Sequence, residues 1–139
     1  MMKIKYHISQ KTEINREIVF KRIGFELDKR GYIIFDVSEN CTEFKNKFWL
    51  LTTRGEYFGK VDGGKFLISP EKDTKVNFYF YASSWREISL IFFLIISSFI
   101  QDYHILFFIP FVLIMFFLRI INVKSTANEI MRNILKETN

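Results

Sequence analysis

The sequence has little of what disulfide-stapled or disordered proteins require. It contains one cysteine, two prolines and six glycines among 139 residues, and 49% of its residues are hydrophobic. A single cysteine cannot form an internal disulfide, and the few cysteine and histidine residues form no motif that predicts a metal site. The hydrophobic content, with so little proline and glycine, excludes a disordered chain and a collagen-like repeat. The composition predicts a folded protein, and we expect no metal and no cofactor.

Charge is nearly absent from one long stretch of the chain. Residues 88 to 118 contain a single formal charge, that of Asp102, and many of their side chains are phenylalanine, isoleucine or leucine. By contrast, residues 1 to 87 hold 16 of the 20 basic groups and 12 of the 15 acidic groups. A soluble domain of this size offers no partner layer large enough to bury such a stretch. The pattern therefore predicts a membrane segment.

Polar residues in the middle of this stretch predict a turn. A single helix over residues 88 to 118 would be about 45 Å long, whereas the hydrocarbon core of a bilayer is about 30 Å thick. It would also place Asp102 near the bilayer centre, at a cost of at least roughly 2.5 kcal/mol. We therefore expect a two-helix transmembrane hairpin over residues 85 to 122, with Gln101, Asp102 and His104 in the far-side turn. The alternative is a shallower hairpin that enters and leaves on the same side, because a first arm over residues 85 to 100 is only about 24 Å long.

Residues beside the two arms predict the orientation. Five of them are expected to anchor the hairpin at the membrane interface, namely Trp85, Arg86, Tyr103, Arg119 and Lys124. The turn contains no lysine or arginine, so both termini are expected to be cytoplasmic, in a bacterial inner membrane. Because the start of the chain lacks the apolar run of a signal peptide, the first apolar arm is expected to direct insertion.

Residues 1 to 84 have the periodicities of a small α+β domain. Residues 4 to 8 alternate as in a strand, a helix is expected to begin near Thr12 and stop before Gly31, and a buried strand follows. Hairpin turns then separate four further segments with strand character, over residues 44 to 53, 57 to 61, 66 to 69 and 76 to 81. We expect a small antiparallel sheet with one packed helix.

The last residues, 123 to 139, predict a C-terminal amphipathic helix. Thr126 and Glu129 have the spacing of a capping box. An apolar stripe follows, formed by Ile130, Met131, Ile134 and Leu135. Because so short a helix is marginal alone, we expect the stripe to dock on the protein's own domain or on a partner, with the membrane surface as a third placement.

Residues with catalytic potential are isolated from one another. His7 has no second histidine in its domain, and no base is marked beside Cys41, so we interpret each as structural or incidental. Basic and aromatic residues interleave at Lys45, Lys47, Phe48, Trp49 and Arg54. This pattern occurs on surfaces that bind single-stranded nucleic acid, but the net charge of residues 1 to 87 is only +4, and anionic lipid accounts for the same residues. We expect no nucleic-acid partner.

These observations favour a non-catalytic role rather than an enzyme. The leading hypothesis is an accessory or interaction subunit of an inner-membrane assembly, with the lipid bilayer and another protein or a second copy as partners. A second hypothesis is an immunity protein that neutralises a toxin acting at the inner membrane. A third is a small transporter or membrane-enzyme subunit, which would need a polar site that the sequence does not mark.

Overall fold

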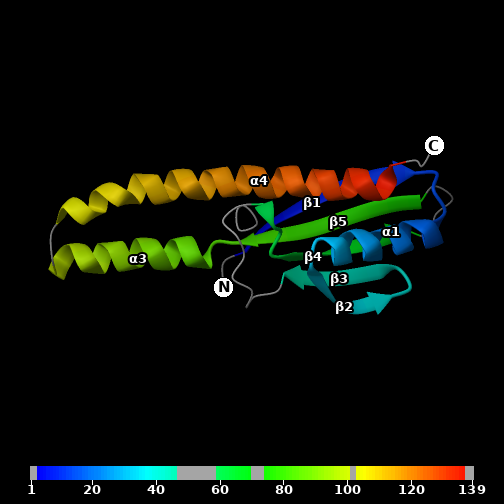
Figure 1. The fold of residues 1–139 in the computed structure, drawn as a ribbon, viewed down its shortest axis with the longest axis horizontal. Helices are drawn as coiled ribbons and strands as arrows, with labels where there is room; N and C mark the ends of the chain where they lie inside the picture. Colours follow the sequence, from blue (N-terminus) through cyan, green and yellow to red (C-terminus); the bar gives the residue numbers. More distant parts are fainter. Residues whose placement is uncertain (1–2, 47–58, 70–73, 101–102, 137–139) are drawn as a thin grey trace.

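The computed structural model describes residues 3–46, 59–69, 74–100 and 103–136. Its strands form one antiparallel sheet in the order β1-β5-β4-β3-β2. The strands are β1 (Lys3–Thr12), β2 (Tyr32–Ser38), β3 (Cys41–Asn46), β4 (Gly63–Ser69) and β5 (Thr74–Ser83). The helices are α1 (Arg16–Lys29), α3 (Trp85–Ile100), the short 3₁₀ helix η1 (Tyr103–Phe108) and α4 (Ile109–Leu135). Figure 1 shows α3 and the first half of α4 extending together beyond one end of the sheet.

Capping residues set the limits of α1. Asn15 is its N-cap, and the Asn15 side chain accepts a hydrogen bond of 3.0 Å from the backbone N–H of Glu17. Gly31 follows the helix with φ of +71°, a left-handed conformation that glycine adopts without strain. The sequence placed the start near Thr12, but Thr12 is the last residue of β1 and pairs with Thr74. The helix therefore begins later than its apolar periodicity predicts.

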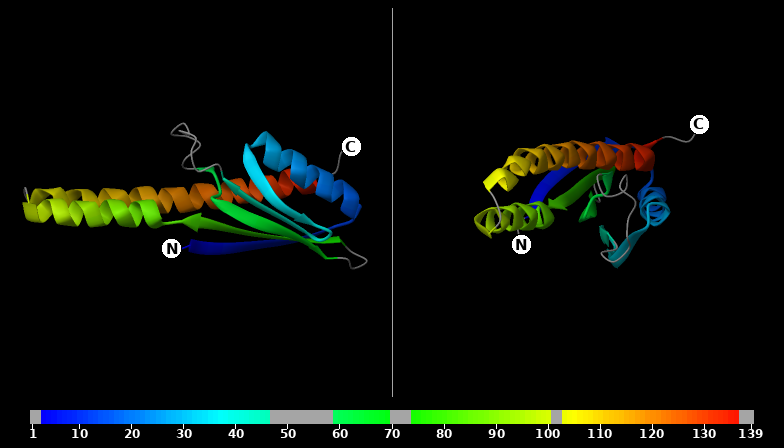
Figure 2. Two further views of the ribbon diagram at one scale, coloured as in Figure 1. Left: turned by 90° about the horizontal axis from the view of Figure 1, so that it is seen from below. Right: turned by 60° about the vertical axis from the view of Figure 1, so that its left-hand side comes forward.

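Aromatic residues build the core on one face of the sheet. Phe66 of β4 lies opposite Phe78 of β5, and their rings stack with centroids 4.1 Å apart. Phe44 extends this cluster into β3, where its ring meets the edge of Tyr32 from β2. The helices α1 and the second half of α4 lie over this face (Figure 2). At about 1.5–3 kcal/mol for each fully buried large apolar side chain, these residues dominate the stability of the domain.

The predicted two-helix transmembrane hairpin is wrong. Within the described ranges, only one helix, Leu106–Leu135, is long and apolar enough to cross a membrane. The other arm, α3, has 16 residues and is about 24 Å long, less than the roughly 30 Å of hydrocarbon. Its length is limited because β5 continues to Ser83 and α3 begins only at Trp85. The lack of charge in residues 88 to 118 correctly predicted an apolar region, but it did not indicate where each helix begins and ends.

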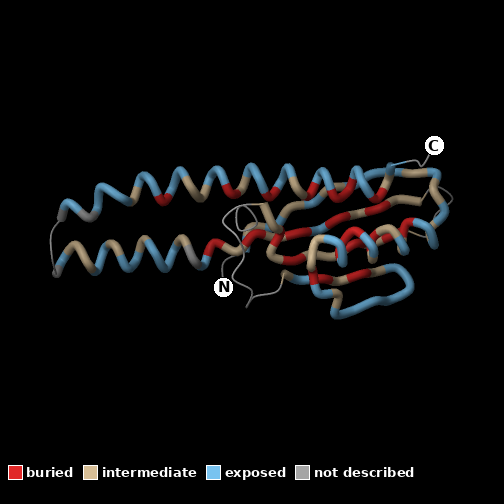
Figure 3. Tube along the Cα trace, viewed as in Figure 1, coloured by how far each residue is buried: buried red, intermediate tan, exposed pale blue. Residues whose placement is uncertain are grey.

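The separate C-terminal amphipathic helix is also wrong, because α4 is continuous from Ile109 to Leu135. Its only proline, Pro110, lies in the first turn, where the missing N–H costs no helical hydrogen bond, and no glycine follows. The capping-box pair Thr126 and Glu129 therefore lies in the interior of α4 and does not begin a helix. Figure 3 shows buried positions recurring along the side of α4 that faces the sheet, whereas most of α3 is exposed or intermediate.

The meander predicted after β2 is described only in part. β3 ends at Asn46, and residues 47–58 lie outside the described residues, including the predicted basic and aromatic positions Lys47, Phe48, Trp49 and Arg54. Val61, predicted in a strand, is buried in the loop before β4, and its N–H donates to the Tyr32 hydroxyl at 3.1 Å. Burial raises the pKa of Tyr32 to about 12, so this phenol stays protonated at neutral pH.

A polar contact joins α1 to the end of α4. The Glu26 carboxylate oxygen Oε1 accepts hydrogen bonds from Arg30 Nε at 2.8 Å and from Asn133 Nδ2 at 3.0 Å. Arg30 also donates to Glu129 at 2.9 Å. Burial by itself raises the pKa of Glu26, but the hydrogen bonds from Asn133 and Arg30 and the charge of Arg30 together outweigh this effect, so the pKa is lowered overall.

Replacing Glu26 with glutamine should change how the free energy of unfolding depends on pH in the acidic range. Because its pKa is lower in the folded state, Glu26 contributes stability above its unfolded pKa, and this contribution is lost as the pH falls through the folded pKa. We expect Glu26→Gln to cost about 1–2 kcal/mol at neutral pH and to flatten the loss of stability on acidification. Urea unfolding of the detergent-solubilised protein at a series of pH values measures both. The exposed control Glu39→Gln should change neither quantity. If Glu26→Gln lost stability on acidification as steeply as the wild type, the lowered pKa of Glu26 would be contradicted.

Candidate membrane-anchor site

Two helical arms project from the sheet with apolar surface exposed. We call α3, η1 and residues 109–118 of α4 the apolar pair. Phe99 and Phe107 are 86% and 89% exposed, and further exposed aromatic side chains are Phe92, Phe93, Phe108, Phe111 and Phe117. Only 17% of the apolar window of the helix Leu106–Leu135 is buried. An apolar surface this continuous is rare on soluble monomers and marks a membrane or protein contact.

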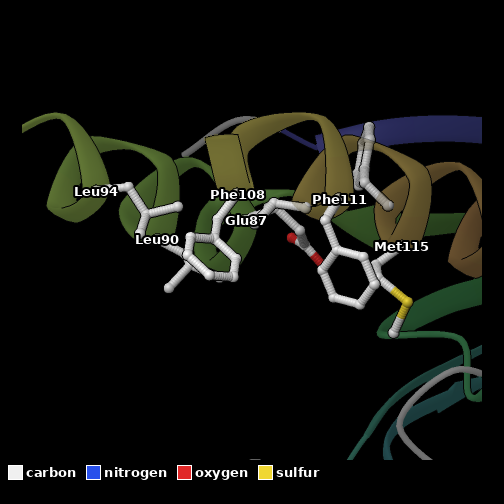
Figure 4. A pocket seen from close by; sticks show the side chains of 8 residues that line it. Glu87, Leu90, Leu94, Phe108, Phe111 and Met115 are labelled. Carbon is white, nitrogen blue, oxygen red and sulfur yellow. The ribbon is translucent and has the colours of Figure 1, made fainter. Parts of the chain in front are cut away.

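A cavity of about 390 Å³ lies between the two arms. Apolar side chains from both arms line it, and Figure 4 shows Leu90 and Leu94 of α3 facing Phe108, Phe111 and Met115 of η1 and α4. Glu87, in the first turn of α3, contributes a carboxylate. Such a lining suits an acyl chain or another apolar group, because it has too few polar groups to orient a polar substrate.

Arg119 connects the apolar pair to the sheet. Its side chain is 2% exposed, and its guanidinium donates to Asp62 Oδ2 at 2.7 Å, to Glu87 Oε1 at 2.7 Å and to the Ser83 carbonyl at 2.8 Å. These partners lie on the loop before β4, in the first turn of α3 and at the end of β5. The planar guanidinium, with several fixed donors, is suited to this task. One side chain of α4 therefore fixes three other elements, and we call these four residues the Arg119 junction.

The carboxylate of Asp62 is also held in place by contacts other than that with Arg119. Its Oδ2 accepts a hydrogen bond from the Ser83 N–H at 2.7 Å. Its backbone N–H donates to the Tyr81 carbonyl at 3.2 Å, and its carbonyl accepts from the Asn46 N–H at 3.0 Å. These hydrogen bonds to the ends of β3 and β5 fix the Asp62 backbone and hold its carboxylate in one orientation.

Sequence reasoning placed Arg119 at the membrane interface and assigned no role to Asp62 or Glu87. The structure places Arg119 inside the junction, where both carboxylates meet it. A usable signal was present, since Arg119 is the first charge after the apolar stretch and Glu87 is the last before it. In a helical hairpin, the residue just before the first arm and the residue just after the second arm lie close together. Asp62 carried no comparable signal, because it lies far away in sequence.

The other predicted interface and turn residues that the structure describes lie on α3, η1 and the second half of α4. Trp85 begins α3 and is 59% exposed, and the Lys124 ammonium lies 4.8 Å from the centroid of the Tyr6 ring. Arg86 is the second residue of α3, Tyr103 is the first of η1, and the side chains of both lie outside the description. His104 is exposed in η1, and Gln101 and Asp102 lie outside the described residues.

The apolar stripe at the end of α4 packs in the protein's own core. Ile130, Met131 and Ile134 are buried, and Leu135 packs against them. Arg22 of α1 donates to the carbonyls of Ile134 at 3.2 Å and of Lys136 at 2.5 Å, which satisfies acceptors at the end of the helix. The tail therefore serves as the second helix that covers the sheet.

Groups with catalytic potential remain scattered in the fold. Among the described residues, no three His, Cys, Asp or Glu side chains are grouped to hold a metal ion. The His7 ring stacks on Tyr79 with centroids 4.4 Å apart. Burial raises the pKa of the Cys41 thiol, and the charge of Glu43 adds to this, so Cys41 is less nucleophilic than an ordinary cysteine at neutral pH.

The described geometry therefore offers two distinctive features, an exposed apolar pair and an ionic junction that fixes it to a sheet. No protein-family model, curated protein or solved structure matches this chain.

Proposed function

We propose that the protein is a non-catalytic, membrane-anchored interaction protein whose apolar pair enters the membrane without crossing it. The observation that carries this proposal is the sharing of α4 between two environments. Its first half belongs to the exposed apolar pair, and its second half lies in the core of the sheet domain. Because α3 also leaves directly from β5, the apolar pair as a whole begins and ends at the sheet. The sheet domain and both termini then lie on the same side, which in our proposal is the cytoplasmic side of a bacterial inner membrane.

The lengths of the arms support a shallow insertion. α3 has 16 residues, about 24 Å, and η1 with residues 109–118 of α4 gives a return arm of similar length. A hydrocarbon core of about 30 Å is thicker than either arm. Trp85 at the base of α3 then lies at headgroup depth, where tryptophan is preferred. The buried Arg119 meets Asp62 and Glu87 at this level rather than hydrocarbon, which removes the cost of an isolated charge.

A rigid connection suits a protein that presents a surface to a partner. The continuous α4 and the Arg119 junction restrict rotation between the apolar pair and the sheet. The face of the sheet away from the helices is thereby held at a fixed orientation to the bilayer. A flexible tether would leave this orientation undefined. We therefore favour an accessory subunit, whose partner is another protein of the membrane or a second copy.

Membrane association should depend on the exposed phenylalanines of the apolar pair. We expect the full chain to float with phosphatidylcholine vesicles and to resist extraction by alkaline carbonate. A Phe99→Asp/Phe107→Asp variant should lose more than tenfold in bound fraction, because each apolar contact is worth about 1.5–3 kcal/mol and each new carboxylate costs about 2.5 kcal/mol or more in hydrocarbon. Phe25→Asp is the matched control, since Phe25 is 71% exposed but lies on α1. Equal flotation of all three proteins would contradict the proposal.

Sidedness distinguishes shallow insertion from crossing. His104 lies in η1, at the tip of the apolar pair, and is exposed. In a Cys41→Ser background, His104→Cys should resist a membrane-impermeant maleimide added on the side opposite the sheet domain. Labelling from that side in sealed vesicles would show that the tip crosses the bilayer, contrary to the proposal.

A further inference from the structure

The helix-free face of the sheet contains a basic and aromatic hollow. None of the described helices covers this face (Figure 2). A cavity of about 560 Å³ lies there. The charged side chains in its lining are Lys3, Lys5, Lys65 and one carboxylate, Glu43, and its aromatic residues include Tyr79 and Tyr81. We call it the basic hollow, because three ammonium groups face one acid.

Strand register assembles the basic hollow from three strands. On β5, Tyr81 lies opposite Lys5 of β1, and Tyr79 lies opposite Lys65 of β4. The Lys3 ammonium lies 4.2 Å from the centroid of the Tyr81 ring, and the Lys65 ammonium lies 5.9 Å from that of Tyr79. Cation–π contacts of this kind hold ammonium groups close to a ring while leaving N–H donors available to an anion.

The basic hollow lies at the end of the sheet from which the apolar pair departs. Lys3 pairs with Ser83, the last residue of β5, and α3 begins two residues later. At about 3.3 Å per residue, Lys5 lies roughly 7 Å and Lys65 roughly 13 Å from this end, measured along the strands. The headgroup layer is about 5–8 Å thick, and electrostatic attraction extends about 8 Å further at physiological salt. All three ammonium groups are therefore within range of headgroup phosphates when the apolar pair is inserted.

We propose that the basic hollow binds the phosphate headgroup of an anionic phospholipid, an inference that rests on the proposed insertion of the apolar pair. The excess of lysine over glutamate gives charge complementarity to a phosphate. The hollow is continuous with a surface proposed to lie in lipid, so a headgroup reaches it from the adjacent bilayer. Each lysine at such a surface strengthens association with anionic lipid by about fivefold. The protein thus selects the lipids around its own anchor.

Spin-labelled lipids test this selection in the full-chain protein. The protein is reconstituted in phosphatidylcholine bilayers at physiological salt, with trace spin-labelled phosphatidylglycerol or phosphatidylcholine. The fraction of each label that is motionally restricted by the protein gives the relative affinity. We expect the wild type to prefer phosphatidylglycerol at least fivefold, and Lys3→Gln/Lys5→Gln to show less than a twofold preference.

The same two strands provide a matched control. Lys11 and Lys75 pair with each other on β1 and β5, eight residues from Ser83 and therefore about 26 Å from the end at the apolar pair. Lys11→Gln/Lys75→Gln removes the same charge from the same face, but about three Debye lengths from that end. We expect this variant to keep the wild-type preference.

The possible results separate this inference from the proposal on which it rests. Protein that enters the bilayer but shows no preference, or loses it equally in both double variants, overturns the headgroup site while leaving insertion intact. Loss of the preference on adding millimolar inorganic phosphate also overturns it, because the hollow would then take a soluble phosphate. Wild-type protein that fails to enter the bilayer overturns the proposed insertion, and the headgroup site with it.

Discussion

Replacing Arg119 with methionine is expected to destabilise the protein by about 3–5 kcal/mol, because it leaves Asp62 and Glu87 without their buried cation. Methionine keeps much of the side-chain volume and helix propensity of arginine, so the loss reports the charges rather than packing. Thermal or urea unfolding of the detergent-solubilised protein measures it. We also expect faster proteolysis near Ser84, where β5 gives way to α3, because the Arg119 junction then no longer holds the two together.

Two further variants establish whether the electrostatic account is correct. Arg132→Met removes a charge from an exposed position on the same helix and should change stability by no more than about 0.5 kcal/mol. Arg119→Met/Asp62→Asn/Glu87→Gln removes all three charges and should recover part of the loss, since neutral polar groups cost less to bury than unpaired charges. If Arg119→Met were as stable as the wild type, the Arg119 junction would have no structural importance.

Replacing Ile134 with aspartate should cost more than about 4 kcal/mol. Ile134 is fully buried between the sheet and α1, so the substitution removes a large apolar contact and places an unpaired carboxylate in the core. A partly or wholly unfolded domain is the expected outcome in thermal unfolding and in circular dichroism. If the stripe were instead a surface for a partner, unfolding would be unchanged and only partner binding would fall.

An exposed residue on the same helix provides the control for this experiment. Asn128→Asp introduces the same charge at an exposed position and should shift stability by no more than about 0.5 kcal/mol. Stability in Ile134→Asp that equals that of Asn128→Asp would contradict the burial of the stripe in the protein's own core. The comparison separates loss of packing from any general effect of added negative charge on α4.

Local patterns in the sequence predicted the parts of the fold that depend on neighbouring residues. Alternation over Val76, Phe78 and Phe80 put these side chains on one face of a strand, and the structure buries all three. Gly31 predicted the end of the first helix because only its backbone adopts φ of +71° without strain. The stripe of Ile130 and Ile134 was likewise identified by helical spacing. Each of these signals lies within a few residues of the feature it specifies.

Helix ends in the apolar region were harder to predict, because hydropathy does not vary where a helix stops. The sequence suggested a hairpin of two membrane arms that ends near Asn122 and a separate tail, whereas α4 runs on without a break into the core. Nothing in the residues around Asn122 breaks the hydrogen-bond ladder, so the helix continues. The capping-box spacing at Thr126 is a signal only where a helix would otherwise begin.

The sequence by itself determined an antiparallel sheet, a first helix that ends at Gly31, an apolar region near the end of the chain and a stripe that must be buried. Only the tertiary structure decided what those parts face. It brought Asp62, Glu87 and Arg119 together from three separate regions, and it placed Lys3, Lys5 and Lys65 around Tyr79 and Tyr81 on the open face of the sheet. The physical reason is that charge pairing and cavities depend on distances of a few ångströms between residues far apart in sequence, and strand register with helix packing sets those distances.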